Sequence, residues 1–296
     1  MEKRYLPPVL ALAGGGVGFA LRKWQLATAF EPETGLAVSG MPATWALLGW
    51  SALVALLVIC FNWKNKERMA WDRAFAGARG NAVFMTAVIL GAFLLLASAG
   101  AEAVSFSVTY QMDAGNELFG AQVASAVLPP LRIGLCLAGL PCIILWVKHL
   151  NQGSEKCKES LALLELCFLF CVWLISDYQV RAADPVVQDY MYEVFAIVCG
   201  LMGIYFVTSY SFQEGKPRRT LFFCLMGAYF SLVTLADQHS LTDIFRYGFV
   251  VLFLIAHAVL LLQEHPPAPE PEAAEETETK DPAAPETKER EAEENA

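Results

Sequence analysis

An uncharged run of twenty-one residues, 81–101 (NAVFMTAVILGAFLLLASAGA), restricts this chain to one class of fold. As a helix it is about 31 Å long, which is close to the hydrocarbon thickness of a bilayer. Its apolar residues surround the helix instead of forming one stripe, so they do not fit an amphipathic helix of a soluble protein. A single central charge would cost about 2.5–3.5 kcal/mol, and the run contains none. The sequence therefore predicts an all-α, polytopic integral membrane protein.

The composition divides the chain into two parts. Of its 296 residues, 56% are hydrophobic and only 17% charged, and the mean hydropathy is +0.43. The net charge of −9 belongs to residues 264–296, which hold twelve acidic and three basic residues, whereas residues 1–263 hold eighteen of each. We predict a transmembrane domain over 1–263 and a disordered acidic tail over 264–296, because the tail lacks aromatic residues and has little apolar surface to bury. No basic stripe indicates nucleic acid.

Eight apolar segments predict a bundle of eight transmembrane helices: residues 5–21, 42–61, 81–101, 128–147, 161–176, 189–212, 220–236 and 244–263. Gly14 and Gly18 form a GxxxG pattern, which favours close helix packing. Pro141 is expected to kink the fourth helix. Residues 24–41 are predicted to hold a short β-hairpin. Residues 102–127 are predicted to form the longest internal loop, and its second part, from Asn116, is expected to be an interfacial helix leading into the next span.

The distribution of basic residues predicts the orientation. The loops after the second, fourth and sixth spans hold five, three and three Lys/Arg residues, and those after the third, fifth and seventh hold none, one and none. The positive-inside rule then places both termini in the cytoplasm, and without an organelle signal we expect a cell membrane. Arg22 and Lys23, just outside the first span, conflict with this orientation. An aromatic belt is expected at the span ends, formed by Trp24, Trp45 and Trp173 outside and Trp63 and Trp146 inside.

The two halves of the predicted domain share short patterns. LGAF at 90–93 corresponds to MGAY at 226–229, and an Arg-x-Gly begins the next span at 132–134 and at 246–248. Their order and membrane direction match, which predicts a parallel four-plus-four repeat of the kind found in transporters. Chance similarity between Leu/Ala/Gly-rich spans is the alternative. Pro141 has no counterpart in the eighth span.

Ionisable residues near the outer span ends are the candidate substrate-binding residues: Arg132, Arg246, Asp177, Glu193 and Asp237. Such residues usually face the interior of a membrane bundle. The two arginines offer bidentate sites for a carboxylate or phosphate, which predicts an outward-facing charged vestibule. The alternative is a set of ion pairs between helices near the headgroups, or side chains that reach to water.

Signatures of enzymes and cofactors are missing from the sequence. It has no HExxH, GxSxG, P-loop or GxGxxG motif, so we predict that the protein is not an enzyme. The eight cysteines show no CxxC or Cys/His metal spacing. His257 lies inside the eighth span without a second histidine at comparable depth, so we predict no haem, other cofactor or metal.

Two functional hypotheses remain. The first is a small-solute permease or permease subunit, suggested by the span count, the repeat and the vestibule. The second is a non-transporting membrane scaffold, assembly factor or sensor that binds a cytoplasmic protein partner through its acidic tail. Both require a lipid bilayer around the domain, and neither identifies a substrate.

Overall fold

The computed structural model describes residues 5–31, 34–63, 71–113, 119–152, 162–181, 186–212 and 215–263. These residues form helices and no β-strand, apart from one isolated antiparallel bridge between Phe30 and Ala37. The long helices are α1 (Leu6–Thr28), α2 (Pro42–Asn62), α4 (Ala82–Asp113), α5 (Phe119–Gln152), α6 (Ala162–Arg181), α7 (Val187–Ser209), α8 (Pro217–Thr234) and α9 (Leu241–Leu261). The short ones are α3 (Trp71–Ala74), η1 (Ala76–Ala78) and η3 (Tyr210–Phe212).

Six of the described helices are long and apolar enough to cross a membrane, which supports a multi-pass membrane protein. They occupy Pro42–Asn62, Ala82–Val108, Ala126–Gln152, Ala162–Gln179, Val187–Phe212 and Leu241–Leu261. The structure therefore supports six of the eight predicted spans, and α1 and α8 are the two left out. α8 begins with Arg218 and Arg219 in its first turn, and most of its residues are buried. Neighbouring helices cover α8, so its sequence does not need the apolar surface of a helix that faces lipid.

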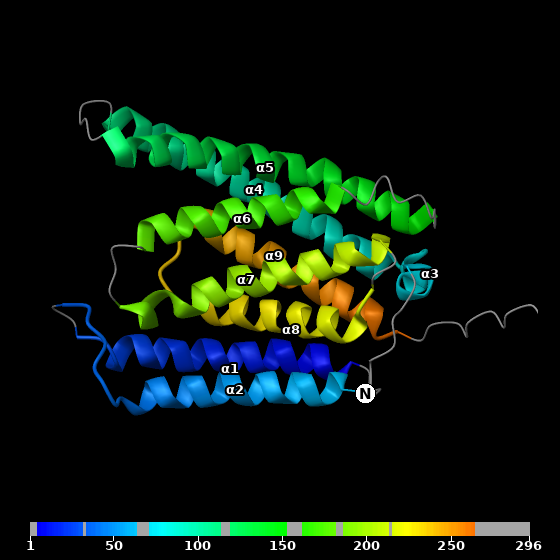
Figure 1. Ribbon diagram of the computed structural model, residues 1–296, viewed down its shortest axis with the longest axis horizontal. Coiled ribbons are helices and arrows are strands. Elements are labelled where there is room, and N and C mark those ends of the chain that lie inside the picture. The colour runs from blue at the N-terminus through cyan, green and yellow to red at the C-terminus, as the bar shows by residue number, and fades with distance from the viewer. Residues whose placement is uncertain are drawn as a thin grey trace, which may run out of the picture. The chain divides into compact units, whose positions relative to one another are not determined.

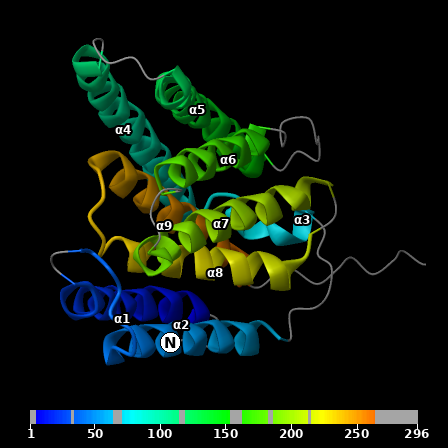
Figure 2. The same cartoon turned by 60° about the vertical axis from the view of Figure 1, so that its left-hand side comes forward.

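The helices pack around α8 and α9. α8 contacts α1, α2, α7 and α9, while α4 packs between α5 and α9, and α6 packs between α5 and α7 (Figure 1). Figure 2 shows α1 and α2 beside α8, on the side away from α4, α5 and α6. α7 packs along α8, but the corresponding pair in the first half, α2 and α4, does not pack in this way. The four-plus-four repeat therefore stays a prediction.

Small residues allow the closest helix contacts, as the GxxxG pattern predicts. A Cβ atom added to Gly18 would lie 2.6 Å from Val233 Cγ2, and one added to Gly14 would lie 3.2 Å from Val54 Cγ2. In α8, a Cβ atom on Gly227 would lie 3.2 Å from the backbone nitrogen of Gly200 in α7. α1 thus packs against α2 and α8 through its glycine face, and α7 and α8 approach backbone to backbone.

Two predictions about segments between the spans differ from the structure. The loop predicted over 102–127 is wrong in its first part, because α4 continues to Asp113, whereas the helix expected from Asn116 agrees with α5, which begins at Phe119. Residues 102–113 contain no proline or glycine that would end the helix. α5 is one helix that contains Pro129, Pro130 and Pro141, and the kink expected at Pro141 stays a prediction. The hairpin predicted over 24–41 is reduced to the single Phe30–Ala37 bridge, with Gly35 at a φ of 68° in its turn.

The predicted aromatic belt stays a prediction for three tryptophans and is wrong for two. Trp24, Trp45 and Trp63 are 44%, 68% and 54% exposed, as side chains at a membrane interface would be. Trp173 and Trp146 are buried, because the first packs against a buried arginine and the second against a buried histidine. The basic loops at 64–70 and 153–161 and the acidic tail at 264–296 lie outside the described residues.

Candidate functional site

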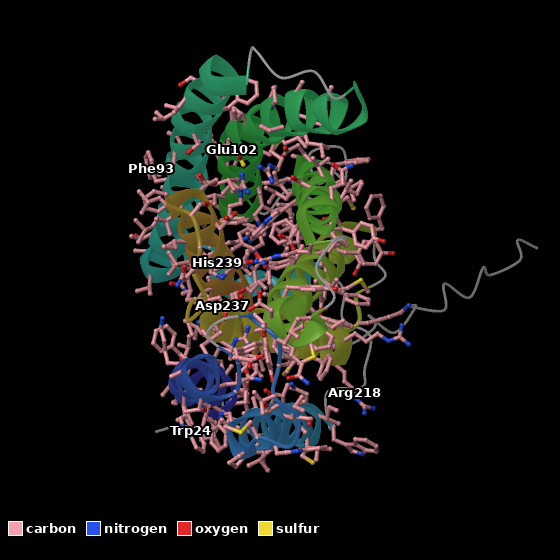
Figure 3. The ribbon with its side chains drawn as sticks, turned by 90° about the vertical axis from the view of Figure 1, so that its left-hand side faces the viewer. Trp24, Phe93, Glu102, Arg218, Asp237 and His239 are labelled. Atoms are coloured by element: carbon pink, nitrogen blue, oxygen red, sulfur yellow. The ribbon has the colours of Figure 1, made fainter. Side chains whose placement is uncertain are left out.

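Ionisable side chains from most of the long helices meet at one end of the bundle. At this end lie the C-terminal parts of α1, α4, α6 and α8 and the N-terminal parts of α2, α5, α7 and α9, because successive long helices alternate in direction. We call this set of side chains the ion-pair layer: Arg22 (α1), Glu102 (α4), Arg132 (α5), Arg181 (α6), Glu193 (α7), Asp237 (after α8) and Arg246 (α9). Figure 3 looks onto this end, with Glu102, Asp237 and His239 labelled.

Glu102 is the centre of the first group in the layer. Arg132 donates from Nε to Glu102 Oε1 over 2.6 Å and from Nη1 to Ser176 Oγ over 2.7 Å. Arg246 donates to the other carboxylate oxygen, Glu102 Oε2, and to Asp243 Oδ1 at 3.2 Å. One carboxylate therefore joins α4, α5 and α9, and Ser176 adds α6.

The guanidinium of Arg246 is almost enclosed by protein. The residue is 1% exposed, and its Cζ atom lies 5.3 Å from the centroid of the Trp173 ring. A cation over an indole face is stabilised by the ring quadrupole. Its Nε atom is buried without a hydrogen-bond partner, so the Nε–H group of Arg246 is an unused hydrogen-bond donor inside the layer.

Arg22 is the centre of the second group. It is fully buried, and its Nε donates to Asp237 Oδ1 over 2.7 Å. Its Nη1 donates to Gln25 Oε1 at 2.8 Å and to the carbonyl oxygen of Gln188 at 3.0 Å, and Nη2 donates to the carbonyl oxygen of Asp189. Arg22 thus holds α1 to the start of α7 and the end of α8.

This group also accounts for Arg22, one of the two residues that conflict with the predicted orientation; the other, Lys23, is exposed. Gln25 donates onward from Nε2 to Thr44 Oγ1 at 3.2 Å, which brings α2 into the layer. Because Arg22 is paired with Asp237 inside the protein, it adds no free positive charge at the membrane surface. An internally paired arginine is a weak topological signal, so the predicted orientation rests on the other basic residues and stays a prediction.

Glu193 is the centre of the third group. Arg181 donates to Glu193 Oε2 at 3.0 Å, and Tyr247 donates from its hydroxyl to Glu193 Oε1 at 3.3 Å. Arg181 lies two residues beyond the spanning segment of α6. Burial alone would lower the pKa of Arg181, but the charge and hydrogen bond of Glu193 outweigh burial and raise this pKa above its usual value. Arg181 therefore stays charged.

His239 connects the second and third groups. Its Nδ1 lies 3.7 Å from Glu193 Oε1, and its Nε2 lies 2.7 Å from the carbonyl oxygen of Thr234. Thr234 in turn donates from Oγ1 to Asp237 Oδ2 at 3.1 Å. Polar contacts therefore run from Arg22 to Glu193, and the Trp173 ring, which contacts both Tyr247 and Arg246, lies between Glu193 and the Glu102 group.

The structure brings the five candidate residues to one end but gives them different partners. Arg132 and Arg246 meet on Glu102, Glu193 pairs with Arg181, and Asp237 pairs with Arg22. Asp177 has one carboxylate oxygen, Oδ2, buried without a hydrogen-bond partner. The alternative of ion pairs between helices is therefore present for four of the five, and an open vestibule stays a prediction.

Sequence reasoning missed several members of the layer. It noted Glu102 only as the end of a span and Arg22 only as a topological conflict, and it placed Arg181 and His239 in loops. Gln25 lies three positions after Arg22, and Tyr247 directly follows Arg246. The first spacing places polar side chains on one helix face and was the available signal. Asp237 lies 215 positions from Arg22, and Glu102 lies 144 positions from Arg246, and no local pattern can indicate pairs so far apart in the chain.

Among the described residues, the interior of the opposite end of the bundle holds a cluster of aromatic side chains. Trp146 donates from Nε1 to His257 Nε2 at 3.1 Å, and His257 Nδ1 lies 2.7 Å from the carbonyl oxygen of Phe253. Phe75, which lies between α3 and η1, places its ring edge-on to those of Trp146, Tyr210 and His257. Both nitrogens of His257 are thus engaged with protein atoms, and neither is directed at a ligand.

Comparisons with known proteins give no further assignment. No family model, no curated protein and no solved structure matches the chain. The class of the protein therefore follows from its own residues: a helical, multi-pass membrane protein with an ion-pair layer at one end.

Proposed function

We propose that the protein is a small-solute permease or permease subunit, and that the ion-pair layer is the gate at its outer end. The observation that carries this proposal is the burial of charge. Glu102 and Glu193 are each 4% exposed, Arg246 is 1% exposed, and Arg22 is fully buried. Charges placed inside a membrane bundle usually mark a pathway for an ion or solute.

Stability alone gives a weak reason for such a layer. A buried ion pair loses much of its Coulomb attraction to desolvation, and a well-packed apolar replacement is often as stable. Ion pairs between helices can, however, break and form again as helices separate and close. In a gate, the charges of each pair that separates during opening become hydrated. This hydration offsets the lost attraction between them, so the closed and open states stay close in free energy.

In this proposal all eight long helices cross the membrane, including α1 and α8. The ion-pair layer supports this, because α1 and α8 both contribute to it at the same end as the six apolar helices. The layer faces the outside of a cell membrane and both termini face the cytoplasm. This orientation agrees with the basic residues at the opposite end, Lys148, Lys216, Arg218 and Arg219.

Access of water to the interior below the layer tests the gate. Ser98 is fully buried and lies one turn deeper in α4 than Glu102. In a variant without native cysteines that carries Ser98→Cys, a membrane-impermeant maleimide should react slowly from outside. Adding Glu102→Gln should raise the labelling rate about tenfold, the equivalent of about 1.4 kcal/mol, because Arg132 and Arg246 lose the carboxylate that joins them.

Glu31→Gln is the matched control, because Glu31 is an exposed carboxylate at the same end. It should leave labelling of the cysteine at position 98 unchanged. Flux of small anionic solutes into proteoliposomes should then be abolished by Arg132→Ala and by Arg246→Ala. Labelling that is insensitive to Glu102→Gln, together with no flux, would contradict the proposal and favour the non-transporting scaffold.

A further inference from the structure

The end of the bundle opposite the ion-pair layer contains a polar corner between α2 and α8. We call it the α2–α8 corner: Asn62, Trp63, Arg218 and Arg219. α8 begins at Pro217 with no acidic residue in its first turn, and Lys216 at its N-cap makes no side-chain capping bond. The positive end of the helix dipole therefore coincides with two arginines.

The register of α2 and α8 places Asn62 against this first turn. Ser51 Oγ lies 2.8 Å from the hydroxyl oxygen of Tyr229, which aligns the two antiparallel helices. Asn62 lies eleven residues after Ser51, and Arg218 lies eleven residues before Tyr229. Eleven residues are about three helical turns, so both side chains lie on the face that carries the Ser51–Tyr229 contact.

A direct contact supports this register. The guanidinium carbon of Arg218 lies 4.3 Å from the centroid of the Trp63 ring, and Trp63 is the residue next to Asn62. Figure 3 shows Arg218 beside α2, away from the labelled residues of the ion-pair layer. The amide of Asn62 therefore faces the N-terminal turn of α8.

Within the part of the chain that the structure describes, the side-chain amide of Asn62 and the guanidinium groups of Arg218 and Arg219 have no hydrogen-bonding or ionic partner. Asn62 is 1% exposed, and neither its Nδ2 nor its Oδ1 makes a hydrogen bond. Arg218 and Arg219 form no ion pair with any described residue. A buried amide without a partner is costly, and next to two cations at a helix N-terminus it matches the donors that bind a phosphate group.

We propose that the α2–α8 corner binds the phosphate of an anionic phospholipid headgroup. Asn62 ends a helix apolar enough to span the membrane, and Trp63 is 54% exposed, so the corner lies at the depth of the headgroups, where tryptophan is enriched. Asn62 donates to a phosphate oxygen, Arg218 and Arg219 supply opposite charge, and acyl chains lie along α2. This site does not depend on the permease proposal.

Lipid retention measures the site directly. The purified full-length protein is exchanged into nanodiscs of phosphatidylcholine with or without phosphatidylglycerol, and retained lipid is counted by native mass spectrometry. The wild type should keep phosphatidylglycerol in preference to phosphatidylcholine. Arg218→Gln should reduce this preference about tenfold, as expected for the loss of one charge-assisted contact. Lys148 of α5 is an exposed residue at the same end of the bundle as the α2–α8 corner. Lys148→Gln removes its charge and should leave the preference unchanged.

Asn62→Leu separates a binding role from a structural one. Leucine removes the unpaired amide, so this variant should unfold at a higher temperature than the wild type in phosphatidylcholine. It should also lose the rise in unfolding temperature that phosphatidylglycerol gives the wild type. Equal lipid retention by wild type and Arg218→Gln would overturn the site, as would an equal loss in Lys148→Gln. Displacement of the lipid by inorganic phosphate would assign the site to a soluble ligand instead.

Discussion

At the scale of single residues, the most consequential arrangement is one carboxylate shared by two arginines. Glu102 binds Arg132 through one oxygen and Arg246 through the other. Two guanidinium groups repel each other, and the buried carboxylate between them compensates this repulsion. When the charge of the carboxylate is lost, the repulsion is no longer compensated. The stability of this end of the bundle therefore depends more on Glu102 than on the other carboxylates of the layer.

Glu102→Gln should accordingly destabilise the protein strongly. It leaves two buried or half-buried arginines without their common partner, and breaking a buried pair in this way costs about 3–5 kcal/mol. Heat-induced unfolding in detergent micelles measures the effect. Asp189→Asn is the control, since Asp189 is more exposed and its pair with Arg181 is long, at 3.4 Å; it should cost about 1 kcal/mol or less. Equal losses in the two variants would show that burial of Glu102 is unimportant.

At the scale of elements, α1 shows how small residues position a helix that is only weakly apolar. Its glycine face lies against Tyr229, Leu232 and Val233 of α8, and Trp50 of α2 donates to the carbonyl oxygen of Gly14 at 3.0 Å. Van der Waals contact and hydrogen bonds, instead of a strongly apolar surface, hold α1 in place. α1 therefore does not need the apolar composition of the six helices that can span a membrane by length and composition.

Two adjacent glycines of α1 should respond in opposite ways to the same substitution. A Cβ atom on Gly15 would lie 2.6 Å from Leu232 Cδ1 and 2.9 Å from Leu232 Cβ, whereas Gly16 has no neighbour within 4 Å. Gly15→Ala should therefore destabilise by about 1–3 kcal/mol through overpacking. Gly16→Ala should stabilise by about 0.5–1 kcal/mol, because alanine favours a helix. Unfolding midpoints in one detergent test both, and destabilisation by Gly16→Ala would contradict the packing described for α1.

At the scale of the whole molecule, the proposed orientation makes the two ends chemically distinguishable from outside the cell. Single cysteines are introduced into the variant without native cysteines. Thr34→Cys, in the exposed turn after α1, should react with an impermeant maleimide in intact cells. Lys148→Cys, at the opposite end of α5, should react only after the membrane is permeabilised. The reverse pattern would invert the orientation and place the ion-pair layer inside.

Sequence patterns were sufficient for the class of fold and the approximate place of the charges, but not for how the charges pair. Hydropathy located all eight long helices, because apolar length is a local property. It missed the extension of α4 beyond its apolar run, since polar residues such as Ser105 and Ser107 can continue a helix without a local signal. The partners of Arg22, Arg132 and Arg246 depend on which helices become neighbours, which is a property of tertiary packing.

The pairing of Arg22 with Asp237 has a consequence for biosynthesis. The two residues are separated by 215 positions, so at ordinary rates of translation about 10–40 s pass between their emergence from the ribosome. During that time α1 has neither its ionic partner nor the α8 surface that receives its glycines. α1 is therefore synthesised long before it can pack against α8, and nascent chains that stop before α8 should leave it exposed to chaperones and membrane proteases.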